Sequence, residues 1–216
     1  MALTTTTDVM NLRTSVPAAP SRIDWRGGLP VLSGAMISLR ELRATDAKDL
    51  LAALGTAEVT RLISPPPPTV DGFEKFIAWT NRQRAAGKSI AYGITLKGSD
   101  TVIGLFQVRS LTTGFENAEW GFALGCDFWG TGIFMDGAQL VLDFAFDVLG
   151  VHRMEAKAAV KNGRGNGALQ KLGAVQEAVL RRSFLRNGVY LDQAYWTILA
   201  STWSQIRAVR TARIIH

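Results

Sequence analysis

The pattern of apolar and polar positions divides residues 36–199 into short strands and amphipathic helices. Alternating or continuous short apolar runs predict strands at 36–42, 90–96, 101–108, 118–124, 152–160, 179–185 and 193–199. Apolar residues spaced three and four apart predict helices that start after Asp46, Thr69 and Gly132, and a further helix that ends at Leu172. The order is strand, two helices, three strands, helix, strand, helix, two strands. It predicts one mixed α/β domain whose first half is antiparallel.

Local breakers support these boundaries. Residues 64–68 read SPPPP and predict a stiff loop, because proline lacks the N–H and restricts the residue before it. Residues 97–100 read KGSD and predict a hairpin turn. Upstream, residues 25–32 (WRGGLPVL) carry apolar anchors that could dock on the domain. Residues 1–22 are Thr-rich and offer little to bury, so we expect a disordered leader followed by a single domain over 23–202.

The most informative stretch is residues 118–138, AEWGFALGCDFWGTGIFMDGA. A predicted strand runs into a loop that contains Gly130-x-Gly132, and a helix follows at once. Free N–H groups and the dipole at a helix start attract an anion such as phosphate or pyrophosphate. The loop lacks the Gly-Lys-Ser/Thr of a nucleoside triphosphate site and the third glycine of a dinucleotide fingerprint. An ordinary strand–helix turn has the same pattern, so the motif alone leaves both interpretations open.

Composition narrows the chemistry. The chain has 216 residues, of which 47% are hydrophobic and 19% charged, as expected for one globular domain. A single cysteine, Cys126, excludes an intramolecular disulfide framework. With only His152 and His216 beside that cysteine, we expect no metal site of the Cys/His type. No apolar run is long enough to span a membrane and no secretory signal is present, so we expect a cytoplasmic protein with no membrane partner.

The basic balance has several possible causes. The formal net charge is +6, which is compatible with nucleic acid, a membrane surface or a phosphorylated cofactor. Residues 203–216 form a basic tail or helix in which Arg207, Arg210 and Arg213 follow one side. A solvated helix and a contact with an acidic partner both fit this segment. Nucleic acid is the less favoured partner, because basic and aromatic residues do not alternate as in RNA-binding segments.

Six segments taken together resemble one family. They are LRELRATDA, VIGLFQV, AEWGFAL, DFWGTG, LGVHRMEAKA and NGRGNGALQKLGA, in this order. Over residues 36–199 the chain resembles the GNAT acetyltransferases and, within them, the RimJ/RimL-type group. The resemblance implies the GNAT fold, an α/β (α+β) domain with a mixed sheet whose central strands, 118–124 and 152–160, splay apart. It further implies acetyl-CoA in that gap as co-substrate and transfer of its acetyl group to a primary amine.

The resemblance also implies cofactor-binding residues. The pantetheine arm would pair with the backbone of Phe122, Ala123 and Leu124. The pyrophosphate would sit on the loop formed by Trp129, Gly130, Thr131, Gly132 and Ile133. Asn162 matches a position whose side chain often bonds the pantetheine arm, and Asn166 and Lys171 follow one and two turns later, near the expected cofactor.

Acetyl transfer needs a base, an oxyanion stabiliser and a proton for the leaving thiolate. Glu119 matches a family glutamate that faces the acceptor, and burial beside Trp120 and Phe122 would raise its pKa into the working range. An ion pair with Arg109 or another base is the alternative. The oxyanion donors would be backbone N–H groups near Phe122 or Ala123.

The general acid departs from the family pattern. Many relatives carry a serine and a tyrosine where this chain has Gly165 and Leu169. A water molecule or an unplaced tyrosine such as Tyr190 would then supply the proton. Asp127 also stands where many members have glutamine or arginine, and Phe134 replaces a usual alanine and could narrow the pocket.

The acceptor stays open at this level. It could be a protein N-terminus, a polyamine, an amino acid or an aminoglycoside-like compound, and a homodimer is possible. The missing serine and tyrosine motivate an alternative function, a GNAT-fold sensor or partner module that binds acyl-CoA without turnover.

Overall fold

The computed structural model describes residues 23–214, so the expected leader at 1–22 lies outside the described residues. The strands are β1 (Leu32–Ser33), β2 (Ile37–Glu41), β3 (Ser89–Leu96), β4 (Val102–Ser110), β5 (Asn117–Leu124), β6 (Arg153–Ala159), β7 (Val175–Arg186) and β8 (Val189–Leu199). The α-helices are α1 (Ala47–Leu54), α2 (Ala57–Thr60), α3 (Val70–Ala85), α4 (Ile133–Asp147), α5 (Gly163–Leu172) and α6 (Ala200–Ile214). Two 3₁₀ turns, η1 (Ala44–Asp46) and η2 (Cys126–Phe128), precede α1 and α4.

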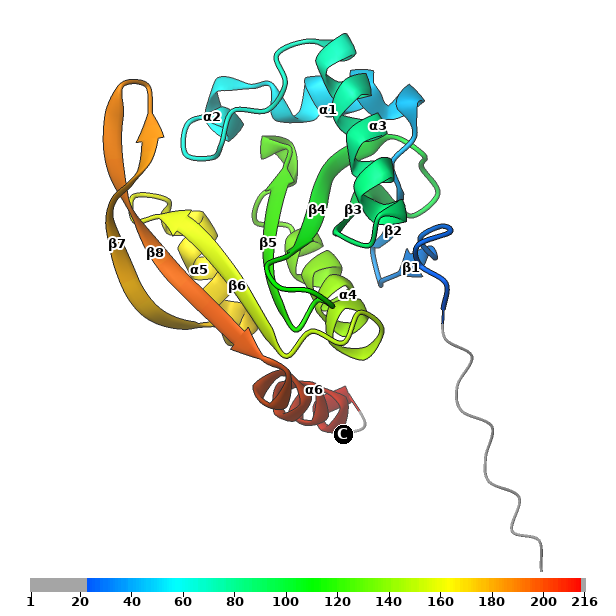
Figure 1. The fold of residues 1–216 in the computed structure, drawn as a ribbon, viewed down its shortest axis with the longest axis vertical. Coiled ribbons are helices and arrows are strands. Elements are labelled where there is room, and N and C mark those ends of the chain that lie inside the picture. Colours follow the sequence, from blue (N-terminus) through cyan, green and yellow to red (C-terminus); the bar gives the residue numbers. More distant parts are fainter. Residues whose placement is uncertain (1–22, 215–216) are drawn as a thin grey trace, which may run out of the picture.

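All eight strands form one sheet in the order β1-β2-β3-β4-β5-β6-β8-β7 (Figure 1). Every neighbouring pair is antiparallel except β5 and β6, which are parallel. The parallel pair is joined over three residue pairs only, of which Glu119 with Glu155 is the last. The predicted mixed sheet with splayed central strands is therefore confirmed.

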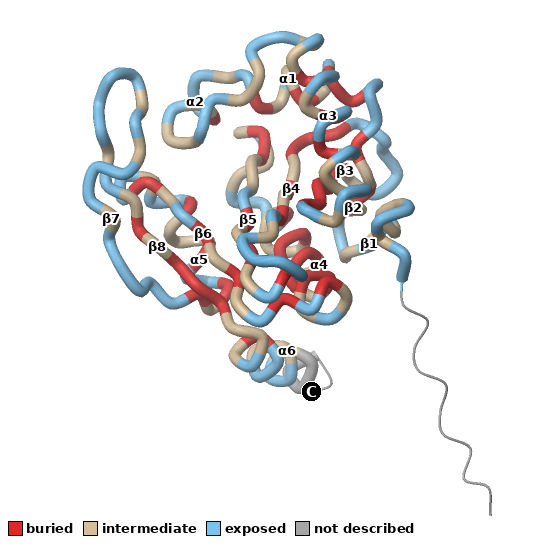
Figure 2. The backbone as a smooth tube through the Cα atoms, viewed as in Figure 1, coloured by how far each residue is buried: buried red, intermediate tan, exposed pale blue. Residues whose placement is uncertain are grey.

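Helices cover the two faces of the sheet and define two apolar clusters. The larger cluster packs β2 to β6 and β8 against α4, α5 and the start of α6. The smaller cluster packs α1, α2 and α3 against the other face of β3 and β4. Strand β3 is buried along almost its whole length because helices lie on both of its faces. Figure 2 shows this burial in the centre, in contrast with the largely exposed β7 and the exposed tip of the β7–β8 hairpin.

Helix starts follow the predicted capping residues in part. The side chain of Thr69 accepts a hydrogen bond from Gly72 N–H at the start of α3, as expected. Asp46 stands before α1, but its carboxylate makes no cap bond to that helix. It instead accepts hydrogen bonds from the buried Arg40 guanidinium and from the backbone N–H of Arg43.

The C-terminal hairpin is longer than predicted. Strand β7 begins at Val175, four residues before the expected start, and most of its residues are exposed. Its turn is Asn187-Gly188, where both residues have positive φ, as a tight type I′ hairpin requires. Arg186 beside this turn donates two hydrogen bonds to the carbonyl of Thr60 at the end of α2. The hairpin tip therefore contacts the α1–α2 segment across the mouth of the splayed strands.

The segment before β1 and the C-terminal helix α6 both pack against the rest of the domain. Trp25 packs edge-on against Phe115 with ring centroids 5.5 Å apart, which confirms the predicted anchor. Helix α6 begins before the expected boundary at 202, and Trp203 is only 2% exposed. Arg207 pairs with Asp143 and Asp147 of α4. The guanidinium of Arg210 lies over the Trp203 ring, whereas the side chain of Arg213 lies outside the described part of the chain.

Candidate active site

The gap between β5 and β6 exposes backbone groups of alternate residues. Hydrogen bonds from Gly125 N–H to Ile103 C=O and from Leu111 N–H to Asn117 C=O join the ends of β5 to β4. Because successive residues of a strand point to opposite neighbours, the even-numbered residues of β5 face the gap. Phe122 thus presents its N–H and C=O, and Leu124 its N–H, to the gap beyond the point where β6 pairs with β5.

The same register corrects one expectation about the backbone. Ala123 lies opposite Leu105 and points its N–H and C=O towards β4. It therefore offers the gap no backbone donor or acceptor. Of the two oxyanion donors considered from the sequence, Phe122 N–H is the one that faces the gap.

A tryptophan fixes the loop that follows β5. The indole N–H of Trp129 donates a 2.8 Å hydrogen bond to the carbonyl of Leu124, at the end of the gap-facing edge. Thr131 Oγ1 donates to the carbonyl of Phe128. Gly130 and Gly132 have φ of 78° and 90°, a left-handed conformation that disfavours other residues. The loop thus reaches Ile133, the first residue of α4, in the arrangement expected of an anion-binding helix start.

Helix α5 starts beside that loop, because β5 and β6 are parallel and a helix returns from each. Asn162 caps α5, with its side-chain oxygen accepting from Gly165 N–H at 3.0 Å. Asn166 is fully engaged within the fold: its amide N–H₂ donates to backbone carbonyls that include Ala159, and its oxygen accepts from the Trp196 indole. These contacts assign Asn166 a role in holding α5 to β6 and β8.

Two further expected site residues lie outside the gap itself. Lys171 is exposed in the last turn of α5, about 10 Å further along the helix than its first turn. Tyr190 lies near the hairpin tip and is 61% exposed. It is seven residues from Thr197, which stands beside Glu155, and that separation corresponds to about 23 Å along β8. Lys171 therefore lies away from the loop, whereas Tyr190 lies on the hairpin whose tip contacts α2 across the mouth of the splayed strands.

The two residues that stand where relatives carry a proton donor serve packing and helix capping instead. Leu169 is 1% exposed and belongs to the main apolar cluster. Gly165 is buried and receives the Asn162 cap. His152 is exposed at the start of β6, and half-buried Cys126 packs against the smaller apolar cluster and donates a hydrogen bond to Asp127. None of these positions offers an acid to the gap.

Glu119 lies on the opposite face of β5 from the aromatic residues. Trp120 and Phe122 pack against Phe106 and Phe134 on the α4 side, with the Phe122 and Phe134 centroids 4.5 Å apart. Since side chains alternate along a strand, Glu119 points away from these rings, contrary to the expected burial beside them. Phe134 packs against Phe122 on the α4 side of β5, and its narrowing of the pocket stays a prediction.

Two cations flank the Glu119 carboxylate. Arg109 Nη2 lies 2.5 Å from Oε2, and Lys157 Nζ lies 3.5 Å from Oε1. The ion pair left open by the sequence is thus observed, although the Glu119 side chain keeps 21% of its surface exposed. It lines a cavity of about 210 Å³ together with Gln107, Arg109, Trp120 and Gly121. A base at this position would exchange one of its cations for the incoming amine.

Further along the same face, charged residues hold β6, β7 and β8 together. Arg153 donates hydrogen bonds to both carboxylate oxygens of Glu177 and to Glu155. These bonds, with a further one from Thr197, lower the pKa of Glu177 to about 2. Burial raises the pKa of Tyr195, and a hydrogen bond to Glu155 adds to that effect.

One residue near the loop was missed from the sequence. The guanidinium of Arg164, in the first turn of α5, lies 4.4 Å from the ring centroid of Trp129. The sequence feature that could have pointed to Arg164 is a basic residue between two glycines, directly after the Asn162 cap. The contact confirms that the starts of α4 and α5 lie side by side.

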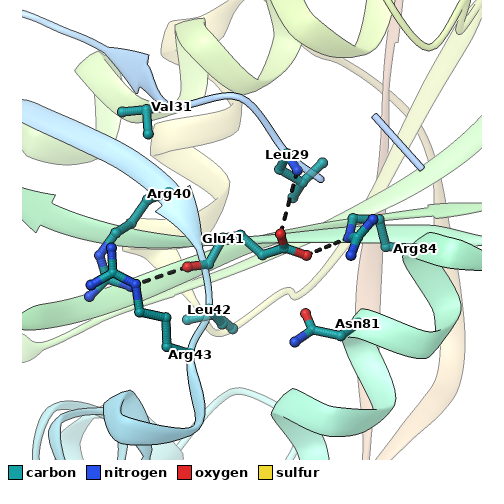
Figure 3. A pocket seen from close by; sticks show the side chains of 8 residues that line it. All are labelled: Leu29, Val31, Arg40, Glu41, Leu42, Arg43, Asn81 and Arg84. Carbon is teal, nitrogen blue, oxygen red and sulfur yellow. Dashed lines mark hydrogen bonds and ion pairs between the residues drawn. The ribbon is translucent and has the colours of Figure 1, made fainter. Parts of the chain in front are cut away.

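A larger cavity at the sheet edge is separate from the gap. It has a volume of about 410 Å³ and lies between β2, α3 and the segment before β1 (Figure 3). Its charged groups are already paired, Arg84 with Glu41 and Arg40 with Asp46 and Asp100. This balance leaves it without an evident ligand preference.

The relatives of this chain agree with this geometry. The family model for an acetyltransferase (GNAT) domain matches residues 37–175. The chain belongs to the GNAT acetyltransferase family. It is accordingly an N-acetyltransferase, and members of this family use acetyl-CoA. Over residues 23–214 no helix is long and apolar enough to cross a membrane, and no group of three potential metal ligands is found.

Individual relatives are distant but match over most of their length. An uncharacterised N-acetyltransferase, p20 of Bacillus licheniformis, is 27% identical over 164 residues, which are 76% of this chain and 92% of p20. YjcK of Bacillus subtilis strain 168, named a probable N-acetyltransferase, is 27% identical over 175 residues, which are 78% of this chain and 97% of YjcK. The structure of Mycobacterium smegmatis RimJ in complex with CoA-disulfide is similar in fold. Its TM-score is 0.71 at 19% identity, over 79% of this chain and 87% of RimJ.

Proposed function

We propose that this GNAT enzyme binds acetyl-CoA in the gap between β5 and β6 and transfers the acetyl group directly to a primary amine. The observation that carries the proposal is the end of β5–β6 pairing at Glu119 and Glu155. Beyond it, Phe122 and Leu124 leave backbone groups facing the gap, and the loop of Gly130 and Gly132 leads into the start of α4. A pantetheine amide chain can pair with such an edge, and a diphosphate suits such a helix start.

In the proposed reaction, the chain positions the amine and stabilises charge. Glu119 takes a proton from the amine, directly or through water, once Arg109 or Lys157 has moved aside. The amine nitrogen then forms a bond to the acetyl carbonyl carbon, and Phe122 N–H donates to the oxygen that gains negative charge. Collapse breaks the carbon–sulfur bond and releases CoA thiolate. The nitrogen gives its extra proton to water to become the amide, and the thiolate takes a proton from water. A thiol pKa of roughly 8.5 makes this a tolerable leaving group without a dedicated acid.

The acceptor belongs to the proposal only as a class. A protein N-terminus and a small-molecule amine both present the primary amine that the mechanism needs, and membership of the RimJ/RimL-type group remains a prediction. The cavity beside Glu119 would receive the amine, and the tip of the β7–β8 hairpin, tied to α2 through Arg186 and Thr60, would border its entrance.

A catalytically weak acyl-CoA-binding module is the second candidate. It is favoured by the two cations on Glu119 and by the absence of an acid at Gly165 and Leu169. Such a protein would hold acyl-CoA in the same gap and signal its presence to a partner.

One experiment separates the two. Acetyl-CoA binding is measured by calorimetry, and thiol release is followed with a panel of amines: peptides with free N-termini, spermidine, single amino acids and an aminoglycoside. We expect binding together with amine-dependent thiol release. Binding without release on any amine would favour the module, and absence of binding would refute both.

A further inference from the structure

Arg164 contradicts the local requirements of the helix that carries it. It is the second residue of α5 and stands between Gly163 and Gly165. A cation at a helix start opposes the helix dipole, and glycine weakens a helix. The first turn of α5 contains no acidic residue that would compensate. Departures of this kind are typical of positions selected for binding rather than for stability.

The residues around Arg164 position its guanidinium beside the loop that precedes α4. Its guanidinium lies over the ring of Trp129, and Trp129 is itself fixed by the hydrogen bond to Leu124. Arg164 is exposed, and no carboxylate among residues 23–214 forms an ion pair with it. The charge is thus positioned by stacking and left free for an anion.

All charged side chains of the loop before α4 and of α4 itself are acidic. Residues 110–152, which contain β5, the loop and all of α4, include no lysine or arginine. Asp127 is exposed at the start of the loop. Backbone N–H groups alone would have to balance a diphosphate there, and a nearby acid would oppose it.

We propose that Arg164 binds the diphosphate of acetyl-CoA, supplying from α5 the positive charge that the loop before α4 lacks. The planar guanidinium can donate two parallel N–H bonds to phosphate oxygens while one face stays on Trp129. The starts of α4 and α5 then act on the same anion from two sides. This inference rests on the proposed function, because it requires acetyl-CoA in the gap.

The test compares three ligands by calorimetry: acetyl-CoA, acetyl-dephospho-CoA, which lacks only the 3′-phosphate, and acetylpantetheine, which has no diphosphate. We expect Arg164→Ala to weaken both CoA forms by about tenfold, as the loss of one charged contact predicts. Acetylpantetheine affinity stays unchanged. Arg164→Lys keeps the charge without the planar fork and should lose less. Arg82→Ala, which removes an exposed arginine from α3, serves as the matched control and leaves all three affinities unchanged.

Three results would overturn the inference. The first is unchanged acetyl-CoA affinity in Arg164→Ala. The second is an equal loss for acetylpantetheine, which would indicate damage to α5. The third is a loss confined to acetyl-CoA, which would assign Arg164 to the 3′-phosphate instead. If the wild-type chain itself fails to bind acetyl-CoA, the proposed function fails. If the wild type binds acetyl-CoA and Arg164→Ala binds it equally well, only the inference about Arg164 fails.

Discussion

The carboxylate of Asp136, in the first turn of α4, accepts a 2.7 Å hydrogen bond from the backbone N–H of Met36, 100 residues earlier in the chain. The same carboxylate accepts from Ala35 and Ile37 at 3.0 and 3.3 Å. It thus ties the beginning of β2 to the helix whose start is the proposed anion site. Gly34 completes the contact, because a Cβ at this position would lie 2.5 Å from both carboxylate oxygens.

Asp136→Asn should destabilise the protein by about 1–3 kcal/mol, since the amide group would turn a donor towards backbone donors. Urea unfolding measures the loss. Gly34→Ala should cost a similar amount in the wild type, because its methyl group would meet the carboxylate. It should cost clearly less in an Asp136→Ala background. If the two changes add without coupling, Asp136 does not hold this segment.

Gly130→Ala tests the proposed anion loop. A side chain at Gly130 is strained by its φ of 78° but would meet no described atom within 4 Å. Gly114 is its matched control, with a φ of 88° and equally open space, in the β4–β5 turn at the far end of the sheet. We expect each change to cost about 1–2 kcal/mol of stability, whereas only Gly130→Ala weakens acetyl-CoA binding. Equal acetyl-CoA affinities in the two variants would place the diphosphate elsewhere.

Glu119→Gln tests the proposed base. General base catalysis contributes about 10²–10⁴-fold, so kcat/KM should fall within that range while acetyl-CoA affinity is kept. Glu155→Gln is the control, because Glu155 is the adjacent carboxylate in the β5–β6 register and is held by Arg153. An unchanged kcat/KM in Glu119→Gln between pH 6 and 9 would show that Glu119 only pairs with its cations.

Local patterns predicted those parts of the fold that depend on local forces. The strand–loop–helix unit around Gly130 and Gly132 and the cap at Thr69 follow from short-range geometry and were found as expected. Strand β7 was shortened in the prediction because most of its residues are exposed, so hydrophobic alternation hardly marks it. Its pairing with β8 and the Asn187-Gly188 turn define it instead.

The site residues depend even more on contacts between distant elements, which local sequence patterns do not reveal. Which backbone groups face the gap depends on strand register, and this excluded Ala123 while it kept Phe122. Lys171 follows Asn162 by nine residues, but helix α5 carries it away from the loop. Arg164 could not be recognised from spacing, since its significance comes from Trp129, 35 residues earlier, on a different element.

Trp203→Ala should show that α6 is part of the folded domain. The indole is almost fully buried, packs near Phe146, and donates a 2.8 Å hydrogen bond to Asp143. Truncation of a buried tryptophan typically costs about 3–5 kcal/mol. Trp203→Phe retains most of the packing and should cost less. Thermal unfolding measures both, and a melting temperature unchanged in Trp203→Ala would show that α6 is not needed for stability.

The Arg153–Glu177 pair should make stability depend on pH in the acid range. The pKa of Glu177 is lowered from its usual value of about 4.5 to about 2, chiefly by hydrogen bonds from Arg153. The native state therefore favours the carboxylate, so the contribution is complete above about pH 4.5 and is lost as the pH falls towards 2. Because the Glu177 side chain is 39% exposed, solvent screening limits this contribution to about 0.5–1 kcal/mol.

Urea unfolding of wild type and Glu177→Gln between pH 7 and pH 3 should show a difference in stability that shrinks as the pH falls. In an Arg153→Gln background the difference should be small at every pH. A gap that stays constant with pH in the wild-type background would mean that the neutral side chain, rather than the charge, holds β7 in place.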